Sequence, residues 1–108
     1  MDDGFDIDVT RLKEMRDQGT PFTLVDVRTP MEHDIAHIEG ATLLPLQELA
    51  QRAEELPSEG LIVLHCHHGG RSAQAVQYLR RLGFEETRNL AGGIDAWSLE
   101  IDPSVPRY

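Results

Sequence analysis

The only cysteine of this 108-residue chain follows a short apolar run and precedes a glycine pair. The segment from Leu61 to Ser72 reads LIVLHCHHGGRS, and helical spacing of apolar residues begins after it. This pattern predicts a strand, a tight loop and a helix, with Cys66 at the point where the loop begins. The backbone N–H groups of such a loop and the positive N-terminal end of the helix both favour an anion. We therefore expect Cys66 to be biased toward the thiolate, which is the nucleophilic form of cysteine.

Two histidines and two glycines separate Cys66 from the next basic residue. Gly69 and Gly70 allow the backbone to curl around the sulfur without a steric penalty. His67 and His68 are expected on the loop rim, where they either tune the local potential or are simply solvated. A loop this tight is not expected to turn adjacent side chains onto one metal ion, and no second ligand pair stands elsewhere in the chain. The sequence therefore predicts neither a metal site nor a cofactor.

Arg71 and Ser72 end the loop and open the helix. Arg71 could hold an anionic substrate with its fork of N–H groups, or it could point to solvent from the helix start. Ser72 could donate a hydrogen bond to the sulfur or cap the helix. Residues 61–88 carry more basic than acidic side chains, whereas residues 1–60 are strongly acidic. The least negative part of the chain thus surrounds the candidate nucleophile.

The bulk properties indicate a soluble globular protein. With 108 residues the chain can bury one hydrophobic core but not two, so we expect a single domain over residues 1–108. It contains no apolar run of membrane-spanning length and no signal-peptide pattern, and its net charge of −9 argues against nucleic-acid binding. A single cysteine excludes an internal disulfide and fits a reducing compartment, so a cytoplasmic location is expected.

Segments typical of strands and helices alternate along the chain. Thr29-Pro30-Met31-Glu32 has the pattern of a capping box with proline at the first helical position. The apolar spacing predicts strands over 22–27, 41–44, 61–65 and 87–90, and helices over 46–56, 73–82 and 93–98, with Ala50 and Leu82 on buried faces. A first helix is expected after a cap at Asp8 or Thr10, with Gly19 as its stop, and a short helix after the capping box. This alternation is typical of an α/β fold with a parallel sheet covered on both faces. Sites in such sheets lie at the carboxyl ends of the strands, where Cys66 stands on one strand and Asp26 and Arg28 on another.

Three parts of the sequence resemble the rhodanese family of persulfide-carrying sulfurtransferases, in the same order and at similar separations. The segments are Val25–Arg28 with Glu32 and His37–Ala41, then Cys66–Ser72, then Leu90–Trp97. The resemblance covers nearly the whole chain. It implies a rhodanese-like three-layer α/β/α fold with a small, mainly parallel central sheet.

The resemblance also implies a chemistry. Cys66 would attack a small anionic sulfur donor such as thiosulfate, or another persulfide, and carry the sulfane sulfur as a persulfide. Because the chain has no second cysteine, the sulfur would leave to an external thiophilic acceptor. Asp26 and Arg28 match the family's Asp-x-Arg motif and would brace the site floor. Glu32 departs from the two-domain thiosulfate sulfurtransferases, which tend to place a basic residue nearby, so it puts thiosulfate in doubt as the natural donor.

Two other classes of function are open at this point. One is a non-enzymatic persulfide-binding or interaction module in a sulfur-relay pathway. The other is a phosphatase or arsenate reductase on the same fold, which the loop disfavours: related phosphatases have five residues between cysteine and arginine, and this chain has four. The tail, Ile101–Tyr108, together with Gly92–Trp97, is similar to the C-terminal end of rhodanese domains fused to ubiquitin-like-protein adenylyltransferases. A sulfur-carrier or adenylyltransferase protein is therefore a candidate partner.

Overall fold

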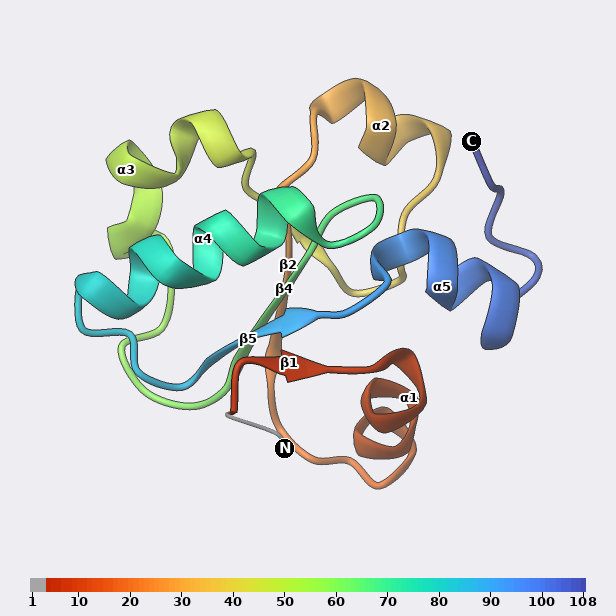
Figure 1. The fold of residues 1–108 in the computed structure, drawn as a ribbon, viewed down its shortest axis with the longest axis horizontal. Helices are drawn as coiled ribbons and strands as arrows, with labels where there is room; N and C mark the ends of the chain where they lie inside the picture. The colour runs from red at the N-terminus through yellow and green to blue at the C-terminus, as the bar shows by residue number, and fades with distance from the viewer. Residues whose placement is uncertain (1–3) are drawn as a thin grey trace.

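Five strands form one sheet in which every neighbouring pair runs parallel. The computed structural model describes residues 4–108 (Figure 1). The strand order is β1-β5-β4-β2-β3. The strands are β1 (Asp6–Ile7), β2 (Thr23–Asp26), β3 (Thr42–Leu43), β4 (Ile62–His65) and β5 (Thr87–Leu90). The predicted parallel α/β sheet is confirmed, with the longest strands at its centre.

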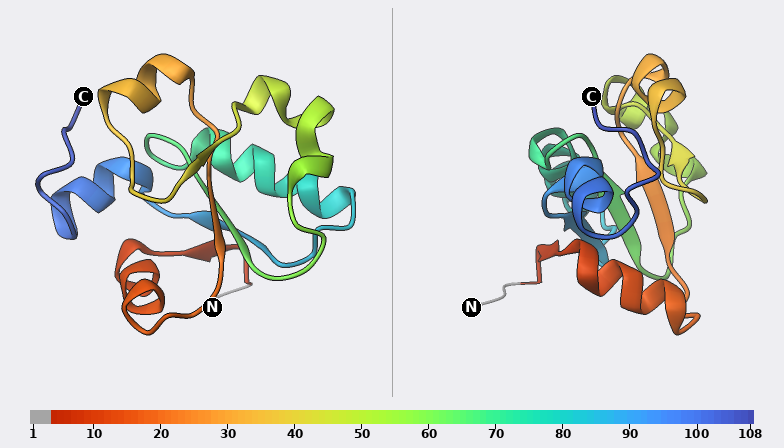
Figure 2. Two further views of the ribbon diagram at one scale, coloured as in Figure 1. Left: turned by 180° about the vertical axis from the view of Figure 1, so that it is seen from behind. Right: turned by 90° about the vertical axis from the view of Figure 1, so that its right-hand side faces the viewer.

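Helices cover both faces of the sheet and make the three predicted layers (Figures 1 and 2). Helices α3 and α4 pack on one face, and α1 and α5 pack on the other. The short helix α2 lies at the carboxyl edge of the sheet (Figure 1). The bounds are α1 (Val9–Asp17), α2 (Pro30–Ile35), α3 (Leu49–Arg52), α4 (Gly70–Arg81) and α5 (Gly93–Glu100).

The central strand β4 is buried along its whole length because both of its faces carry a core. Ile62 and Leu64 point into the core beneath α3 and α4, and Val63 points into the core beneath α1 and α5. Successive side chains of a strand alternate between the two faces of a sheet, so a strand covered on both sides is mainly apolar. This explains the apolar run from Leu61 to Leu64; the last residue of β4, His65, is the buried polar exception.

Three sequence-based predictions of local structure were wrong. The segment predicted as one helix over 46–56 breaks into a 3₁₀ turn (η1, Leu46–Glu48), α3, and a second 3₁₀ turn (η2, Ala53–Glu55), and Ala50 is exposed. No side-chain cap holds either end of α3, so the chain tightens into 3₁₀ turns there. Leu82 is 51% exposed because α4 ends at Arg81 and the tight final turn rotates Leu82 off the buried stripe. Strand β1 was missed because it has only two residues.

The carboxyl ends of β2 and β4 meet at one edge of the sheet. Asp26 and His65 are register partners, and the backbone N–H of Val27 donates to the His65 carbonyl at 3.0 Å. The start of α5 is tied to the same edge, since the Ile94 N–H donates to the Cys66 carbonyl at 3.0 Å. The topology therefore gathers segments from three parts of the sequence around Cys66.

No helix within residues 4–108 has both the length and the apolar character needed to cross a membrane.

Gly93 lets α5 approach the Cys66 loop, and its replacement should cost stability. It has φ +59°, and a Cβ there would lie 2.5 Å from the His67 carbonyl oxygen and 2.6 Å from that of Cys66. We expect Gly93→Ala to lower the free energy of unfolding in urea by about 2 kcal/mol more than Gly60→Ala, because overpacking costs roughly 1–3 kcal/mol. Gly60 is the matched control, since it also has positive φ but faces open space. Equal losses in the two variants would show that the close approach carries no energetic weight.

Candidate active site

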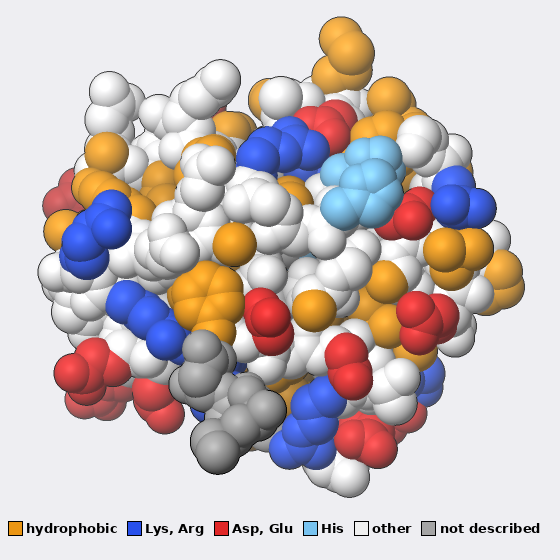
Figure 3. Space-filling view, viewed as in Figure 1, with side chains coloured by type: hydrophobic (Ala, Val, Ile, Leu, Met, Phe, Trp, Pro, Cys, Tyr) orange, Lys and Arg blue, Asp and Glu red, His pale blue; other side chains and the backbone are white. Residues whose placement is uncertain are grey.

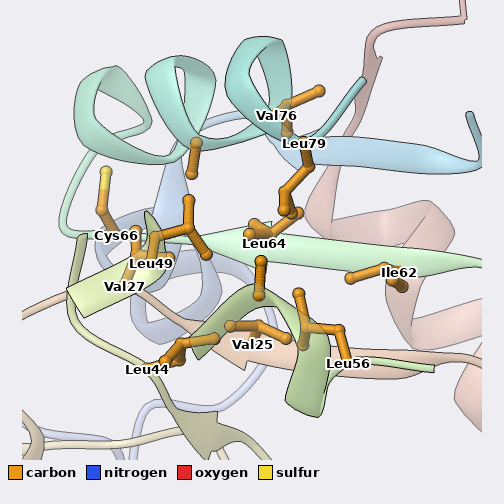
Figure 4. Packing of buried hydrophobic residues seen from close by; sticks show 12 residues of the cluster. Val25, Val27, Leu44, Leu49, Leu56, Ile62, Leu64, Cys66, Val76 and Leu79 are labelled. Atoms are coloured by element: carbon orange, nitrogen blue, oxygen red, sulfur yellow. The ribbon is translucent and has the colours of Figure 1, made fainter. Parts of the chain in front are cut away.

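The Cys66 sulfur lies in a pocket of hydrogen-bond donors at the end of β4. The side chain is 2% exposed and points toward the first turn of α4 (Figure 4). The Gly69 N–H donates to Sγ at 3.0 Å, and the Ser72 hydroxyl oxygen lies 3.4 Å from Sγ. Val27 and Leu49 belong to the apolar cluster that contains Cys66. The thiol thus contacts apolar side chains on one side and hydrogen-bonding groups of the loop and of α4 on the other.

These donors lower the pKa of the Cys66 thiol. Burial alone raises the pKa of Cys66, but the Ser72 hydroxyl and the backbone N–H groups of Ser72, Gly69 and Arg71 outweigh burial and lower the pKa below its ordinary value. Hydrogen bonds to the charged form of a group favour that form. The expected bias of Cys66 toward the thiolate therefore has a physical basis in the loop.

Of the two loop glycines, only Gly69 needs to be glycine for its backbone. It has φ +125°, which a residue with a Cβ rarely adopts. This conformation turns its N–H toward the sulfur and starts α4 without a side-chain cap. Gly70 is the first residue of α4 and has no positive φ, so the tight curl that the sequence predicted for both glycines rests on Gly69.

Arg71 is paired with an acid instead of pointing freely to solvent. Its guanidinium forms a two-point ion pair with Glu32, at 2.7 Å from Nη1 to Oε1 and 2.9 Å from Nη2 to Oε2. This pairing holds the pKa of Glu32 far below its usual range. Glu32 also closes the predicted capping box with Thr29 at the start of α2. An incoming anion must therefore compete with a carboxylate for Arg71.

Asp26 and Arg28 form a fully buried ion pair next to the site. Two guanidinium nitrogens of Arg28 donate to the Asp26 carboxylate at 2.9 and 2.7 Å. The remaining donors reach the carbonyl oxygens of Ala36, at 2.6 Å, and Glu32, at 3.3 Å, and the Tyr108 hydroxyl, at 2.8 Å. A buried charge is tolerated when it is paired and its donors are satisfied, and both conditions hold here. The pair ties β2 to α2 and to the C-terminal tail.

His65 lies under the loop as a fully buried neutral side chain. Its Nδ1 is 3.3 Å from the Cys66 carbonyl oxygen, which can only accept, so Nδ1 carries the proton. Among residues 4–108, the Nε2 of His65 has no hydrogen-bond partner. Burial lowers the pKa of His65 to about 4, against an ordinary value of 6.5, even though the charge of Asp26 opposes this shift.

Tyr108 is a site residue that sequence reasoning missed. The C-terminal tail returns to lie beside α2 and α5 (Figures 1 and 2). The Tyr108 hydroxyl accepts from Arg28 and donates to Glu32 Oε2, each at 2.8 Å. Its ring stacks on His67 with centroids 4.2 Å apart and planes 10° apart. Local sequence carries no signal for a contact between residues 80 positions apart.

Asn89 is the second residue missed. It lies on β5, is 6% exposed, and its amide oxygen is 2.5 Å from the Ser72 hydroxyl. Its amide nitrogen donates to the Asp6 carboxylate at 3.0 Å. A polar residue at the carboxyl end of a predicted strand was the available signal, but Thr87 and Arg88 of the same strand are polar as well, so nothing singled Asn89 out.

The two loop histidines meet an acid on the outer rim of the site. His67 and His68 stack with centroids 4.1 Å apart, and His68 Nε2 lies 3.6 Å from an Asp95 carboxylate oxygen. Histidine side chains gather into one patch on the face seen in Figure 3. One ligand atom from each of the three residues lies within 4.8 Å of the others, so this group could hold a metal ion. The sequence argument against a metal rested on the tight loop and on the lack of a second ligand pair elsewhere, and it did not foresee that the fold brings the single acid Asp95 to the loop. Asp95 also pairs with Arg107 at 3.0 Å.

The arrangement offers one nucleophile with its own anion-stabilising donors. Backbone N–H groups aimed at a fixed point stabilise charge without reorganisation during a reaction. The donors converge on the position of Sγ, and the one side-chain cation at the loop is already paired with Glu32. Chemistry that places charge on a sulfur attached to Cys66 fits this geometry.

Comparisons with known proteins agree with the geometry. The sequence profile of the rhodanese-like domain matches residues 8–100. A sulfurtransferase of Allochromatium vinosum is 40% identical over 82 residues, which cover 76% of this chain and 77% of that protein. The probable adenylyltransferase/sulfurtransferase MoeZ of Mycobacterium tuberculosis is 37% identical over 107 residues, which cover 97% of this chain. Those residues are 27% of MoeZ, so the chain spans about a quarter of the length of that relative.

Solved structures show the same fold. The crystal structure of a rhodanese-like domain protein from Staphylococcus aureus has a TM-score of 0.84 and 28% identity, with 96% of this chain and 98% of that chain covered. A rhodanese-related protein from Thermoplasma volcanium has a TM-score of 0.84 and 31% identity, with 96% and 99% covered.

The buried His65 should make the fold sensitive to acid. The pKa of His65 is about 4 in the folded protein, and its ordinary value of 6.5 applies to the unfolded chain. Between these two pH values the unfolded chain therefore binds more protons than the folded one. Stability is therefore complete above that window and falls as the pH drops through it, by on the order of 3 kcal/mol. Urea unfolding at several pH values measures this loss, and His65→Leu should remove it. His37→Gln, at an exposed site, should retain the wild-type slope; a slope unchanged in His65→Leu would contradict this assignment.

Proposed function

The chain belongs to the family of rhodanese-like domains, and on that premise we propose that it is a sulfurtransferase that carries sulfane sulfur as a persulfide on Cys66. The observation that supports this proposal is the set of donors converging on one buried sulfur. The pKa of Cys66 is lowered by the Ser72 hydroxyl and by loop N–H groups, in spite of burial. The same donors can hold the terminal, anionic sulfur of a persulfide.

The reaction divides into two transfers. The Cys66 thiolate attacks the outer sulfur of a donor, the sulfur–sulfur or sulfur–sulfonate bond of the donor breaks, and the leaving group takes the electron pair. With thiosulfate the leaving group is sulfite, and Cys66 keeps one additional sulfur and one negative charge. A thiophilic acceptor such as cyanide then attacks the terminal sulfur and regenerates the thiolate. Because Cys66 is the only cysteine, the second nucleophile must come from outside the chain.

The Glu32–Arg71 pair supports a persulfide over thiosulfate as the physiological donor. Thiosulfate is a small dianion and would need a free cation at the loop. Arg71 instead makes two short contacts to Glu32, at 2.7 and 2.9 Å. A donor that presents its sulfur from a larger thiol would gain affinity from other contacts and would not depend on Arg71.

Relatives suggest the kind of partner. The adenylyltransferase/sulfurtransferase MoeZ contains a region similar to this chain. An adenylyltransferase or a sulfur-carrier protein is therefore a proposed partner, and the reduced cytoplasm, which keeps a lone thiol free, is the proposed location. A phosphatase is disfavoured because four residues separate Cys66 from Arg71, and the loop donors converge on a single atom.

Releasing Arg71 from its ion pair with Glu32 should lower the KM for thiosulfate. Glu32→Gln removes the charge that competes with the donor, so we expect the thiosulfate KM to fall about fivefold, the order for a partly exposed ion pair worth up to about 1 kcal/mol. Steady-state thiocyanate formation measures this. Glu48→Gln is the matched control because it breaks the pair with Arg52, at 2.9 Å, on another surface. A higher KM in Glu32→Gln would mean that the pair helps to bind the donor rather than opposing it.

Persulfide formation on Cys66 is the direct test of the proposal. After incubation with thiosulfate and removal of excess donor, the intact mass of the wild type should increase by one sulfur atom. Cyanide should remove this increment, since it attacks the terminal sulfur. Cys66→Ser should gain no sulfur, because the thiolate is the nucleophile. A wild type that never gains sulfur from thiosulfate or from a small-molecule persulfide would overturn the proposed function.

A further inference from the structure

The Ser72 hydroxyl has one proton and three acceptors around it. Its oxygen lies 3.4 Å from Cys66 Sγ, 3.3 Å from the Gly69 carbonyl oxygen and 2.5 Å from the Asn89 amide oxygen. Ser72 is fully buried, so no bulk water can supply another donor. A hydroxyl donates only one hydrogen bond at a time. The acceptor that takes this proton therefore decides what the hydroxyl offers to the sulfur.

The orientation of Asn89 is fixed by a neighbouring strand. The amide nitrogen of Asn89 donates to Asp6 Oδ1 at 3.0 Å, and a carboxylate can accept this bond but not return one. Asp6 and Asn89 are register partners on β1 and β5, so the contact is set by the pairing of the strands. With its nitrogen held by Asp6, Asn89 must turn its oxygen toward Ser72.

The distances favour Asn89 as the resting acceptor. The 2.5 Å separation from the Asn89 oxygen is at the short end for an O–H···O hydrogen bond, whereas 3.4 Å is an ordinary separation for a contact to the larger sulfur atom, and a neutral thiol sulfur is only a weak acceptor. While Cys66 is a neutral thiol, the Ser72 hydroxyl can donate to the Asn89 oxygen and accept a hydrogen bond from the thiol, so the donation to sulfur that lowers the pKa of Cys66 belongs to the thiolate state. Once Cys66 is an anion, the hydroxyl must rotate and donate to sulfur, and the bond to Asn89 is lost.

We propose that Asn89 is a positioning residue that competes with Cys66 for the Ser72 proton and thereby limits how much of Cys66 is held as an anion. This proposal rests on Cys66 being the reacting thiol, as proposed above. The chain of contacts runs from Asp6 on β1 through Asn89 on β5 to Ser72 on α4. This chain of contacts links the edge strand β1 to the sulfur. Because the Asp6 carboxylate can only accept, it fixes which end of the Asn89 amide faces Ser72.

Removing the competing acceptor should make the thiol more reactive. Asn89→Leu keeps a similar volume and leaves sulfur as the best acceptor for the Ser72 proton. At a pH below the thiol pKa, alkylation of Cys66 by iodoacetamide should accelerate about tenfold, the order for a hydrogen bond gained by a charged group. The ultraviolet absorbance of the thiolate should increase in parallel. In a Ser72→Ala background, Asn89→Leu should have no effect on either measurement.

A buried hydroxyl on the same strand provides the matched control. Thr87→Val removes the hydrogen bond from Thr87 Oγ1 to the Phe84 carbonyl oxygen, at 3.1 Å, and should leave alkylation unchanged. If Asn89→Leu does not fold, Asp6→Ala releases the Asn89 amide and should give a smaller increase in the same direction. The proposal is overturned by an unchanged or slower alkylation, by an increase that survives in Ser72→Ala, or by an equal increase in Thr87→Val. Alkylation involves no sulfur transfer, so its outcome is separate from that of the proposed function.

Discussion

A buried sulfur surrounded by fixed hydrogen-bond donors is the constraint on which the rest of this structure depends. Cys66 is 2% exposed, a degree of burial that by itself favours the neutral thiol. The Ser72 hydroxyl and the backbone N–H groups of Ser72, Gly69 and Arg71 outweigh this effect and lower the pKa of Cys66. Such donors act only if the backbone is held in one conformation. The surrounding elements can be understood as the means of holding it.

Two sets of contacts hold the loop from opposite sides. On one side the start of α5 donates backbone hydrogen bonds to the loop carbonyls, and Gly93 makes this approach sterically feasible. On the other side Arg71 is paired with Glu32 of α2, and Glu32 accepts from the Tyr108 hydroxyl. The cost is that the cation at the loop is already neutralised. A small anion that enters the site would therefore have to compete with Glu32 for Arg71.

Most of the fold followed from local sequence patterns, and the missed features are those that depend on distant contacts. The apolar run before Cys66 indicated the buried central strand, and the Thr29–Glu32 pattern indicated a capped helix; both are present. Tyr108 and Asn89 were missed because their partners are far away in sequence, so no spacing rule reports them. The sequence predicts that residues of one loop lie close together, whereas contacts between separate helices, strands and the tail become visible only in the tertiary structure.

The central claim is that this loop performs chemistry on a single sulfur atom, and a comparison of two activities in one preparation tests it most directly. Thiocyanate formation from a sulfur donor and cyanide should be compared with phosphate release from an aryl phosphate, in the wild type and in Cys66→Ser. We expect Cys66-dependent thiocyanate formation and no Cys66-dependent phosphate release, because the short loop aims its N–H groups at one atom and offers too few of them for a tetrahedral anion. Cys66-dependent phosphate release at a rate rivalling sulfur transfer would contradict it.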